Sequence, residues 1–521
     1  GKVVLPSSLI GTTVATGRTS KPTCLILKEL FMQVKDILRQ LDLGNSVAEF
    51  DESLEKYFVE TKTFYDLVNG RYDIIAGDKG TGKTALFRIL TKRYRTIAEL
   101  SRVEVVPAFN PIGNPIFQRL TESEVLDEGQ YIIMWKTYIL CLTGNWILQI
   151  YEDDFTDEMK LLEELLRKME LRSSDPAPVS IFSRIVTWLK TLKPKSIEAA
   201  FTYTKEGLPI VTPKIEFDKE TNTKSATSSS EINKHDVGLS LVDTILRKEK
   251  LSIWLVLDRL DEAFQGFPKT ELPALRALFR AYLDLLLYNN IRLKIFVRRD
   301  LFRRIIVGGF VNLTHINAKK IEIIWDDEDL RNLIIRRVKE NHTFFFFLGI
   351  VGLSSQEIFE SIFPSQVDPG ERQATTWTWM MSRIRDGNHV KPPRNLIDLV
   401  VKAQNAQLRK EDREGREYQK GNPIINSESL KRGLSSLSEQ RVQDTLLAEA
   451  GDKAELIIKF RDGKSEYNDA TLLPLLGGNE AEFRENVKAL MEIGFLEQVG
   501  ESHKIPILYR DGLRITQGKA F

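Results

Sequence analysis

The chain has 521 residues, enough for about three domains with buried cores. Lys and Arg total 74 against 73 Asp and Glu, so the molecule as a whole has no net charge that would attract a polyanion. Two cysteines, Cys24 and Cys141, are too few for a disulfide framework or a cysteine-based zinc site, which favours a cytoplasmic location. The apolar run at 344–353 is far shorter than the ~20 residues of a membrane span. We expect it to be a buried strand or core segment, and we expect no membrane contact.

Five short segments are apolar at consecutive positions, which is typical of strands covered on both faces of a sheet. These segments are residues 72–76, 103–106, 253–257, 293–297 and 321–325. Helical patterns lie between them, for instance at 85–94 and 272–287. The alternation predicts an α/β fold, in which helices flank a parallel sheet.

Composition shifts at two places along the chain. Residues 193–236 are rich in turn and linker residues and predict a surface excursion, such as a hairpin with a loop. Residues 409–423 are dense in charge and end in Gly-Asn-Pro, which indicates a solvated helix end and a domain boundary. Between the two, the chain becomes largely helical after residue 326, which predicts a helical lid. Its expected helices are residues 329–339, 355–362, 373–385 and 394–408.

Residues 77–84 match the pattern G-x-x-x-x-G-K-[ST] in full, between an apolar strand and a helix. Glycines at three positions should allow positive φ and bring backbone N–H groups close to a polyphosphate. Lys83 is expected to reach the β- and γ-phosphates of ATP, and Thr84 to ligate Mg²⁺. The residues predicted to bind the nucleotide are Gly77, Asp78, Lys79, Gly80, Thr81, Gly82, Lys83, Thr84 and Ala85.

A second acidic motif follows the strand at 253–257. Asp258 ends this strand, at the place where a P-loop protein holds its magnesium ion. Asp261 and Glu262 come three residues later, and one of them should orient or activate the attacking water. Glu262 is the favoured base, with Asp261 as its competitor. An acidic N-terminal cap of the next helix is the other interpretation of this pair.

Arginines follow the strand predicted at 293–297. Arg298 or Arg299 should sense the γ-phosphate from the strand tip, unless they only pair with Asp300. Arg303 and Arg304 are candidates for arginine fingers that act across a subunit interface, although ordinary surface arginines have the same pattern.

Arg394 follows Pro392 and Pro393, which fix it at a helix N-terminus. The helix macrodipole disfavours a cation there by some ~0.3–1 kcal/mol, so the position calls for an explanation. Contact with the nucleotide phosphate from the lid supplies one, and a structural salt bridge is the alternative.

With these motifs, residues 45–405 resemble the AAA+-related group of P-loop ATPases that includes ORC/Cdc6-like, STAND and KAP proteins. The chain is most similar to bacterial P-loop ATPases with a C-terminal winged-helix-like module. The resemblance implies a sensor role for Arg394 and an extra strand between the two Walker strands. The acidic pair after Asp258 and an insertion at 107–250 depart from the group's pattern. Members of this group are nucleotide-controlled switches in replication initiation, signalling and antiviral defence.

Residues 440–521 are expected to form a small separate module. A capping box and an apolar face predict a helix at 479–493, and apolar segments at 495–499 and 505–509 predict a strand pair. This order resembles a winged helix, whose helix would enter the DNA major groove. The helix is acidic, however, and phosphate would repel it. Docking or control of oligomerisation is therefore favoured over DNA contact.

These observations divide the chain into four parts. We expect an N-terminal helical segment (1–44), a P-loop ATPase core (45–325), a helical lid with a charged linker (326–423) and a winged-helix-like module (424–521). The favoured function is a slow or trigger-dependent ATPase switch that uses ATP and Mg²⁺ and couples nucleotide state to the C-terminal module, a partner protein or a second copy. A non-hydrolysing nucleotide-gated scaffold and a DNA-binding ORC-like ATPase are the alternatives.

Overall fold

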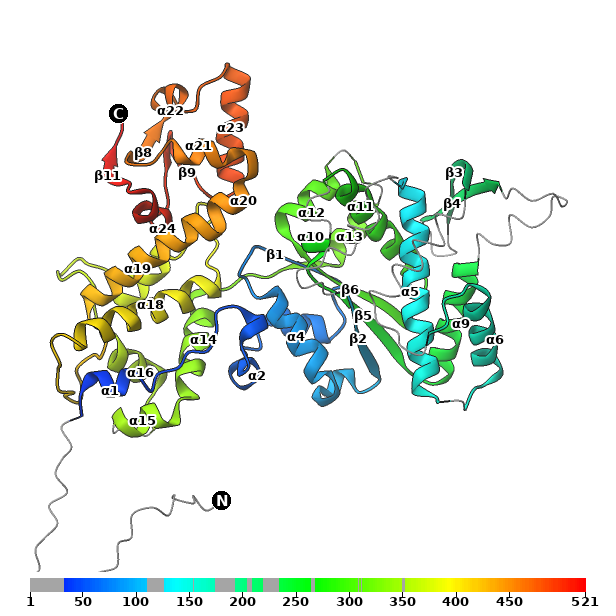
Figure 1. Ribbon diagram of the computed structural model, residues 1–521, viewed down its shortest axis with the longest axis horizontal. Helices are drawn as coiled ribbons and strands as arrows, with labels where there is room; N and C mark the ends of the chain where they lie inside the picture. The colour runs from blue at the N-terminus through cyan, green and yellow to red at the C-terminus, as the bar shows by residue number, and fades with distance from the viewer. Residues whose placement is uncertain are drawn as a thin grey trace, which may run out of the picture.

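The computed structural model has two lobes, an α/β lobe with a central sheet and a largely helical lobe that carries the C-terminus (Figure 1). The residues that it describes are 32–109, 126–152, 154–173, 193–203, 209–218, 234–263, 268–307, 309–310, 312–348 and 352–521. No helix within these ranges is both long and apolar enough to cross a membrane.

The α/β lobe is built on a five-stranded parallel sheet of order β2-β5-β6-β1-β7. The strands are β1 (Ile74–Gly77), β2 (Val103–Phe109), β5 (Ser252–Leu257), β6 (Ile291–Arg298) and β7 (Lys320–Glu322). All five correspond to predicted strands, and the predicted α/β class is confirmed. Strand β6 lies between β1 and β5, which confirms the extra strand expected between the two Walker strands.

Helices cover both faces of this sheet, which is why its strands are apolar at consecutive positions. One face packs on α5 (Glu128–Ile150), α9 (Lys234–Lys248), α11 (Pro268–Leu285), α12 (Arg299–Ile306) and α13 (Leu313–Ala318). The other face packs on α3 (Lys62–Val68) and α4 (Lys83–Arg93). The odd-numbered residues of β5 face the first layer and its even-numbered residues the second. The sheet is therefore a buried platform whose carboxyl edge is left for a site.

The insertion after β2 supplies α5, α9 and α6 (Asp157–Lys168), and α6 packs outside α5 and α9. It also contains the antiparallel pair β3 (Lys193–Tyr203) and β4 (Pro209–Asp218), so the hairpin predicted within residues 193–236 is observed. The rest of that segment, at 204–208 and 219–233, lies outside the described residues.

The helical lobe begins with α14 (Asp327–Lys339), α15 (His342–Leu348), α16 (Ser355–Ile362), α17 (Thr376–Arg383) and α18 (Pro393–Glu411). The four lid helices that the sequence predicts are among them. Residues 344–348 lie in α15, so the strand is wrong there, whereas the core segment is confirmed because Phe344 and Leu348 belong to the apolar core; residues 349–351 lie outside the described residues. Phe344 and Leu348 are buried at helical spacing, whereas Phe346 between them is 79% exposed. A run of phenylalanines does not by itself distinguish the periodicity of a helix from that of a strand.

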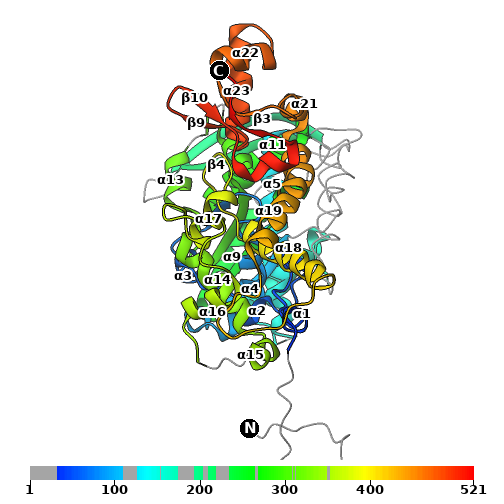
Figure 2. The same ribbon diagram turned by 90° about the vertical axis from the view of Figure 1, so that its left-hand side faces the viewer.

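Helix α19 (Ser427–Arg441) packs along α18 and leads into the C-terminal module (Figure 2). The module contains α20 (Ala448–Ala450), α21 (Ala454–Ile458), β8 (Lys464–Asn468), α22 (Asp469–Leu476), α23 (Glu480–Glu492), β9 (Glu497–Val499), β10 (Ser502–Lys504), α24 (Ile507–Arg510) and β11 (Thr516–Lys519). Its sheet has the order β11-β8-β10-β9. The predicted helix is present as α23. The strand predicted at 505–509 is wrong: Pro506 starts α24 there, and the strand that pairs with β9 lies at 502–504.

One apolar core joins the lid and the C-terminal module. It runs from Val34 in α1 (Val34–Leu38) to Ile515 and includes side chains from α14 to α24. Between α18 and α19, the Arg416 guanidinium donates to Glu411 and to the backbone oxygens of Pro423 and Ile424. The charged segment at 409–423 is thus tied to its neighbours, and the boundary placed there stays a prediction.

Candidate nucleotide-binding site

The predicted phosphate loop connects β1 to α4, and its backbone has the shape that the motif requires. Gly80 has φ +77° and Gly82 has φ +99°, conformations that cost a residue with a Cβ about 1–2 kcal/mol. Gly77 is needed for space rather than for positive φ, since a Cβ there would lie 2.6 Å from the Thr81 hydroxyl oxygen. That hydroxyl donates to the carbonyl of Asp78 at 2.7 Å. The loop therefore places its backbone at the N-terminus of α4, where backbone N–H groups attract an anion.

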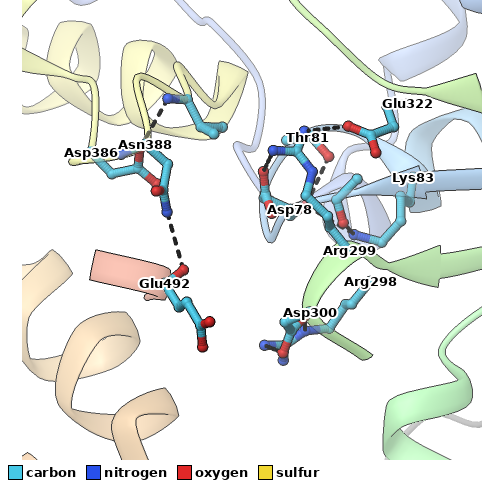
Figure 3. A network of polar contacts seen from close by, with 12 residues as sticks. Asp78, Thr81, Lys83, Arg298, Arg299, Asp300, Glu322, Asp386, Asn388 and Glu492 are labelled. Atoms are coloured by element: carbon cyan, nitrogen blue, oxygen red, sulfur yellow. Dashed lines mark hydrogen bonds and ion pairs between the residues drawn. The ribbon is translucent and has the colours of Figure 1, made fainter. Parts of the chain in front are cut away.

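Lys83, the first residue of α4, turns back over the loop. Its Nζ donates to the carbonyl oxygens of Gly77 at 2.8 Å and Asp78 at 2.9 Å (Figure 3). Burial lowers the pKa of the Lys83 ammonium, and the nearby carboxylates of Asp258 and Asp261 act against this shift. The ammonium thus lies among loop atoms and carboxylates, beside the position where a nucleotide phosphate would lie.

Asp258 follows the last residue of β5 and is 1% exposed. Burial raises the pKa of this carboxyl to about 6, opposed by a hydrogen bond with Thr84 and by the charge of Lys83. Its Oδ2 atom is buried and accepts no hydrogen bond. A buried carboxylate oxygen without a donor, next to a threonine hydroxyl, has the donor chemistry that Mg²⁺ prefers. In the part of the chain described by the structure, no cluster of three or more His, Cys, Asp or Glu could hold a metal alone. Asp258, Thr84, phosphate oxygens and water would therefore share the ion.

The predicted acidic pair lies in the short helix α10 (Leu260–Ala263), beside Asp258. Asp261 and Glu262 both line the cavity at the phosphate loop. Asp261 lies 3.5 Å from Nη1 of Arg298. Glu262 lies 3.1 Å from Nη1 of Arg259, a residue for which the sequence predicted no role. The two carboxylates therefore have different arginine partners.

The two arginines after β6 lie in different places. Arg298 lines the cavity, and its Nε and Nη2 donate to Asp300 at 3.0 Å. Arg299 lies outside the cavity and pairs with Asp78 at 3.3 Å and with Glu322 at 3.1 Å, so it braces the back of the phosphate loop (Figure 3). Of the two arginines, Arg298 is therefore the one that faces the cavity.

The candidate finger arginines follow on α12. Arg304 lines the cavity and pairs with Glu271 at 2.6 Å, whereas Arg303 is exposed and does not line it. Their action across a subunit interface stays a prediction.

Arg394 lies in the first turn of α18, beside the phosphate loop. A Cβ built on Gly80 would lie 3.2 Å from Cβ of Arg394 and 3.4 Å from Cβ of Pro392. Arg394 also lines the cavity. The lid thus approaches the loop closely at Gly80, and this second glycine of the motif is needed for the close approach as well as for its φ.

These residues converge on one cavity of about 970 Å³ between the α/β lobe and the lid. Predicted residues that line it are Lys79, Gly80, Thr81, Gly82, Lys83, Thr84, Ala85, Asp258, Asp261, Glu262, Arg298 and Arg394. One wall of the cavity, formed by residues 45–49 and by side chains such as Tyr57 and Phe58, was not predicted from the sequence. The same holds for Trp325, whose Nε1 donates to the Thr81 carbonyl at 2.8 Å. None of these belongs to a motif, and only folding brings them to the loop.

A second polar cluster joins the lid to the C-terminal module near the phosphate loop (Figure 3). Asp386, in the loop between α17 and α18, accepts hydrogen bonds from the backbone N–H groups of Asn388 and Val390, each at 2.9 Å. Burial raises the pKa of the Asp386 carboxyl to about 6. The Asn388 amide donates to the Glu492 carbonyl at 3.1 Å, at the end of α23. The loop that precedes Arg394 is thus bonded to the module.

No family model and no curated protein matches this chain. Solved structures similar to it include the Walker-type ATPase of Pyrococcus abyssi, at 11% identity over 91% of this chain and 100% of that one, with a TM-score of 0.39. The Aeropyrum pernix ORC1 protein in complex with DNA is similar at 11% identity over 90% and 96%, with a TM-score of 0.35. The Aeropyrum pernix ORC2 protein is similar at 11% identity over 88% and 91%, with a TM-score of 0.34.

Two of these three similar structures are named as ORC proteins. The STAND-type and antiviral interpretations and the closer kinship with bacterial P-loop ATPases stay predictions. The fold assignment itself rests on the strand order of the sheet and on the phosphate loop between β1 and α4.

Proposed function

We propose that this protein is an ATP-binding and ATP-hydrolysing switch of the AAA+-related, ORC/Cdc6-like type. One observation carries the proposal: the phosphate loop, Asp258, Arg298 and Arg394 come from four separate elements and line the same cavity. Chance would not gather a P-loop, a buried carboxylate and two arginines around one space of nucleotide size.

The loop and the helix N-terminus would bind the phosphates of ATP. Backbone N–H groups at residues 79–84 donate to the β- and γ-phosphates, and Lys83 moves from its carbonyl partners to the phosphate oxygens. Asp258 and Thr84 would hold Mg²⁺, which neutralises charge on the phosphates when it is bound. The ion would then be the partner of the buried Oδ2 of Asp258, which accepts no hydrogen bond.

Hydrolysis needs a group that orients water, and Glu262 is the favoured residue. Both carboxylates line the cavity, but Asp261 pairs with Arg298, whereas Glu262 pairs with Arg259. Asp261 is therefore better placed to orient this arginine, which would detect the γ-phosphate from the tip of β6. Arg394 would contact the phosphates from the lid, so that the lid closes only on nucleotide.

The contacts of the lid loop would carry the nucleotide state to the C-terminal module. Pro392 and Arg394 touch the phosphate loop, while Asp386 and Asn388, a few residues earlier, are bonded to one another and to α23. A shift of Arg394 toward phosphate must therefore strain or move this connection. The module, whether winged helix or docking surface, would take a different position in each nucleotide state.

Two variants test this function and separate it from a scaffold that binds nucleotide without turnover. Lys83→Ala should reduce the affinity for labelled ATP at least about tenfold, because a charge-assisted contact with phosphate is lost. Glu262→Gln should bind ATP like the wild type but release phosphate about 10²-fold more slowly. Arg167→Ala, which removes an exposed ion pair of α6 with Glu163, is the control. Unchanged phosphate release by Glu262→Gln would favour the scaffold, and unchanged affinity of Lys83→Ala would end the proposal.

A DNA-binding ATPase is the second candidate, and a basic groove between α18 and α19 supports it. The groove has a volume of about 420 Å³ and is lined by Lys402, Arg409, Lys410, Arg413 and Arg432 against Glu414 and Glu428. Phosphate contacts of this kind make binding steeply dependent on salt. By contrast, α23 carries four glutamates against Arg484 and Lys488.

Duplex DNA binding measured at several salt concentrations tests this candidate. The double variant Arg409→Glu and Arg413→Glu should reduce the affinity and flatten the slope of log K against log salt by about 2. Arg167→Glu on the surface of α6 is the matched control. Deletion of residues 440–521 is a poor substitute, because the module shares its core with the lid. Affinity that is absent or unaffected by the double variant rules this candidate out.

A further inference from the structure

Arg259 directly follows the proposed magnesium ligand and has an unusual backbone. Its φ is +56°, a left-handed conformation that costs a non-glycine residue on the order of 1–2 kcal/mol. The side chain lines the nucleotide cavity and is 14% exposed. Strained residues at a site persist when the surrounding structure requires their position. The contacts of the guanidinium show what that requirement is.

The Arg259 guanidinium is shared by two carboxylates. Its Nη1 lies 3.1 Å from both carboxylate oxygens of Glu262, and its Nη2 pairs with Oε1 of Glu49. Glu49 is 15% exposed, and its Oε2 is buried without a hydrogen-bond donor. A planar guanidinium can serve two carboxylates at once with separate nitrogens, which the point charge of lysine does not do in a fixed geometry. Arg259 therefore fixes Glu262 relative to Glu49.

Glu49 comes from a segment that is anchored on the lid. It lies in a short 3₁₀ helix (Ala48–Phe50), and the residue that follows this helix, Asp51, pairs with Arg337 of α14 at 3.0 Å. Both partners of this pair are at most 5% exposed, and Arg337 also donates to the Leu43 carbonyl. A buried ion pair resists separation, since either charge alone would cost about 3–5 kcal/mol. Glu49 is therefore linked through Asp51 to α14 of the lid, and the Asp51 carbonyl also accepts a hydrogen bond from Arg88 of α4 at 3.3 Å.

We propose that Arg259 is the positioning residue for Glu262, and that the segment 45–51 makes this positioning depend on the lid. The proposal rests on the function proposed above, in which Glu262 orients the attacking water. With the lid in place, Glu49 holds one side of the Arg259 guanidinium and Glu262 is held by the other. When α14 shifts, Glu49 withdraws, and Arg259 and Glu262 lose their common geometry. Hydrolysis thereby becomes conditional on lid position, while nucleotide binding does not.

Steady-state ATPase rates and ATP affinities of four variants test this inference. Arg259→Asn tolerates the left-handed backbone and removes the guanidinium, so we expect kcat to fall about tenfold with ATP affinity unchanged within about twofold. Arg259→Lys should recover only part of the rate. Glu49→Ala should lower kcat about threefold, and combining it with Arg259→Asn should lower kcat no further, because both act through one contact.

The control is Arg167→Ala, which should change neither quantity. Thermal melting of each variant with and without nucleotide verifies that the cavity forms. A kcat of wild-type size for Arg259→Asn overturns the inference, as does an additive double variant. A parallel loss of ATP affinity also overturns it, because Arg259 would then be structural. The proposed function has its own test: if Glu262→Gln hydrolyses ATP at the wild-type rate, the failure lies there and not in the role of Arg259.

Discussion

Asp258→Asn should stabilise the nucleotide-free protein while removing its response to Mg²⁺. The Asp258 carboxyl is buried, and its pKa in the folded protein is about 6, against 3.8 for an exposed aspartate. Each pKa unit corresponds to 1.36 kcal/mol, so the buried charge costs the folded state about 3 kcal/mol at pH 7.5.

The sign of the pH dependence follows from the raised pKa. The folded protein holds this proton more tightly than the unfolded chain. Below pH ~4 the Asp258 carboxyl is protonated in both states, so it does not destabilise the folded protein. The free energy of unfolding then falls as the pH rises from about 4 to 6, and it stays lower above that range. Asparagine does not titrate. The free energy of unfolding of the variant should therefore exceed that of the wild type by an amount that grows as the pH rises from about 4 to 6.

The full gain of about 3 kcal/mol is an upper value. Lys83 is also buried, and the negative charge of Asp258 stabilises the protonated form of this lysine. The variant loses that stabilisation, which offsets part of its gain in the free energy of unfolding. Asparagine can still accept a hydrogen bond from the Thr84 hydroxyl, which preserves the local packing. We expect a net gain of about 1–2 kcal/mol at pH 7.5, which is roughly one to two thirds of the penalty.

Urea unfolding at pH 4.5 and pH 7.5, followed by tryptophan fluorescence, measures this difference, because Trp254 lies in β5 itself. Addition of ATP with Mg²⁺ should shift the wild-type transition to higher urea and leave the variant nearly unchanged. A variant that is less stable than the wild type at pH 7.5, or one that keeps the magnesium-dependent shift, would refute the reasoning.

Three further substitutions have distinct expected effects. Gly80→Ala forces a Cβ into a backbone with φ +77° and toward Arg394, and it should lower ATP affinity at least about tenfold in an equilibrium titration. Trp325→Phe removes the hydrogen bond to the phosphate loop, worth about 1 kcal/mol, so the same titration should show about fivefold weaker binding. Gly387→Ala would bring a Cβ to 2.7 Å from the Leu496 carbonyl oxygen. This clash should weaken the packing of the C-terminal module on the lid loop by about 1–3 kcal/mol. Limited proteolysis should then release the module faster, while ATP affinity is retained. Equal proteolysis of wild type and this variant would contradict the role given to the lid loop.

Local sequence pattern was sufficient for the α/β lobe and for the central part of the site. Consecutive apolar residues predict strands covered on both faces, and the phosphate loop has a motif because its glycines, lysine and threonine act within eight consecutive residues. Asp258 and Arg298 could be placed as well, because each follows directly on an apolar strand, and parallel strands end at the same edge.

Contacts between distant segments were decided only by the tertiary structure. Arg299 follows a strand tip like Arg298, yet Asp78 and Glu322 turn it to the back of the loop. Glu49 has no motif around it and reaches the site because its segment is bound through Asp51 to Arg337 of the lid and to Arg88 of α4. Periodicity and spacing describe one stretch of chain at a time, whereas an ion pair depends on where two stretches meet. The sequence therefore determined where the phosphate loop lies between a strand and a helix, and the packing of the lid decided which residues surround it.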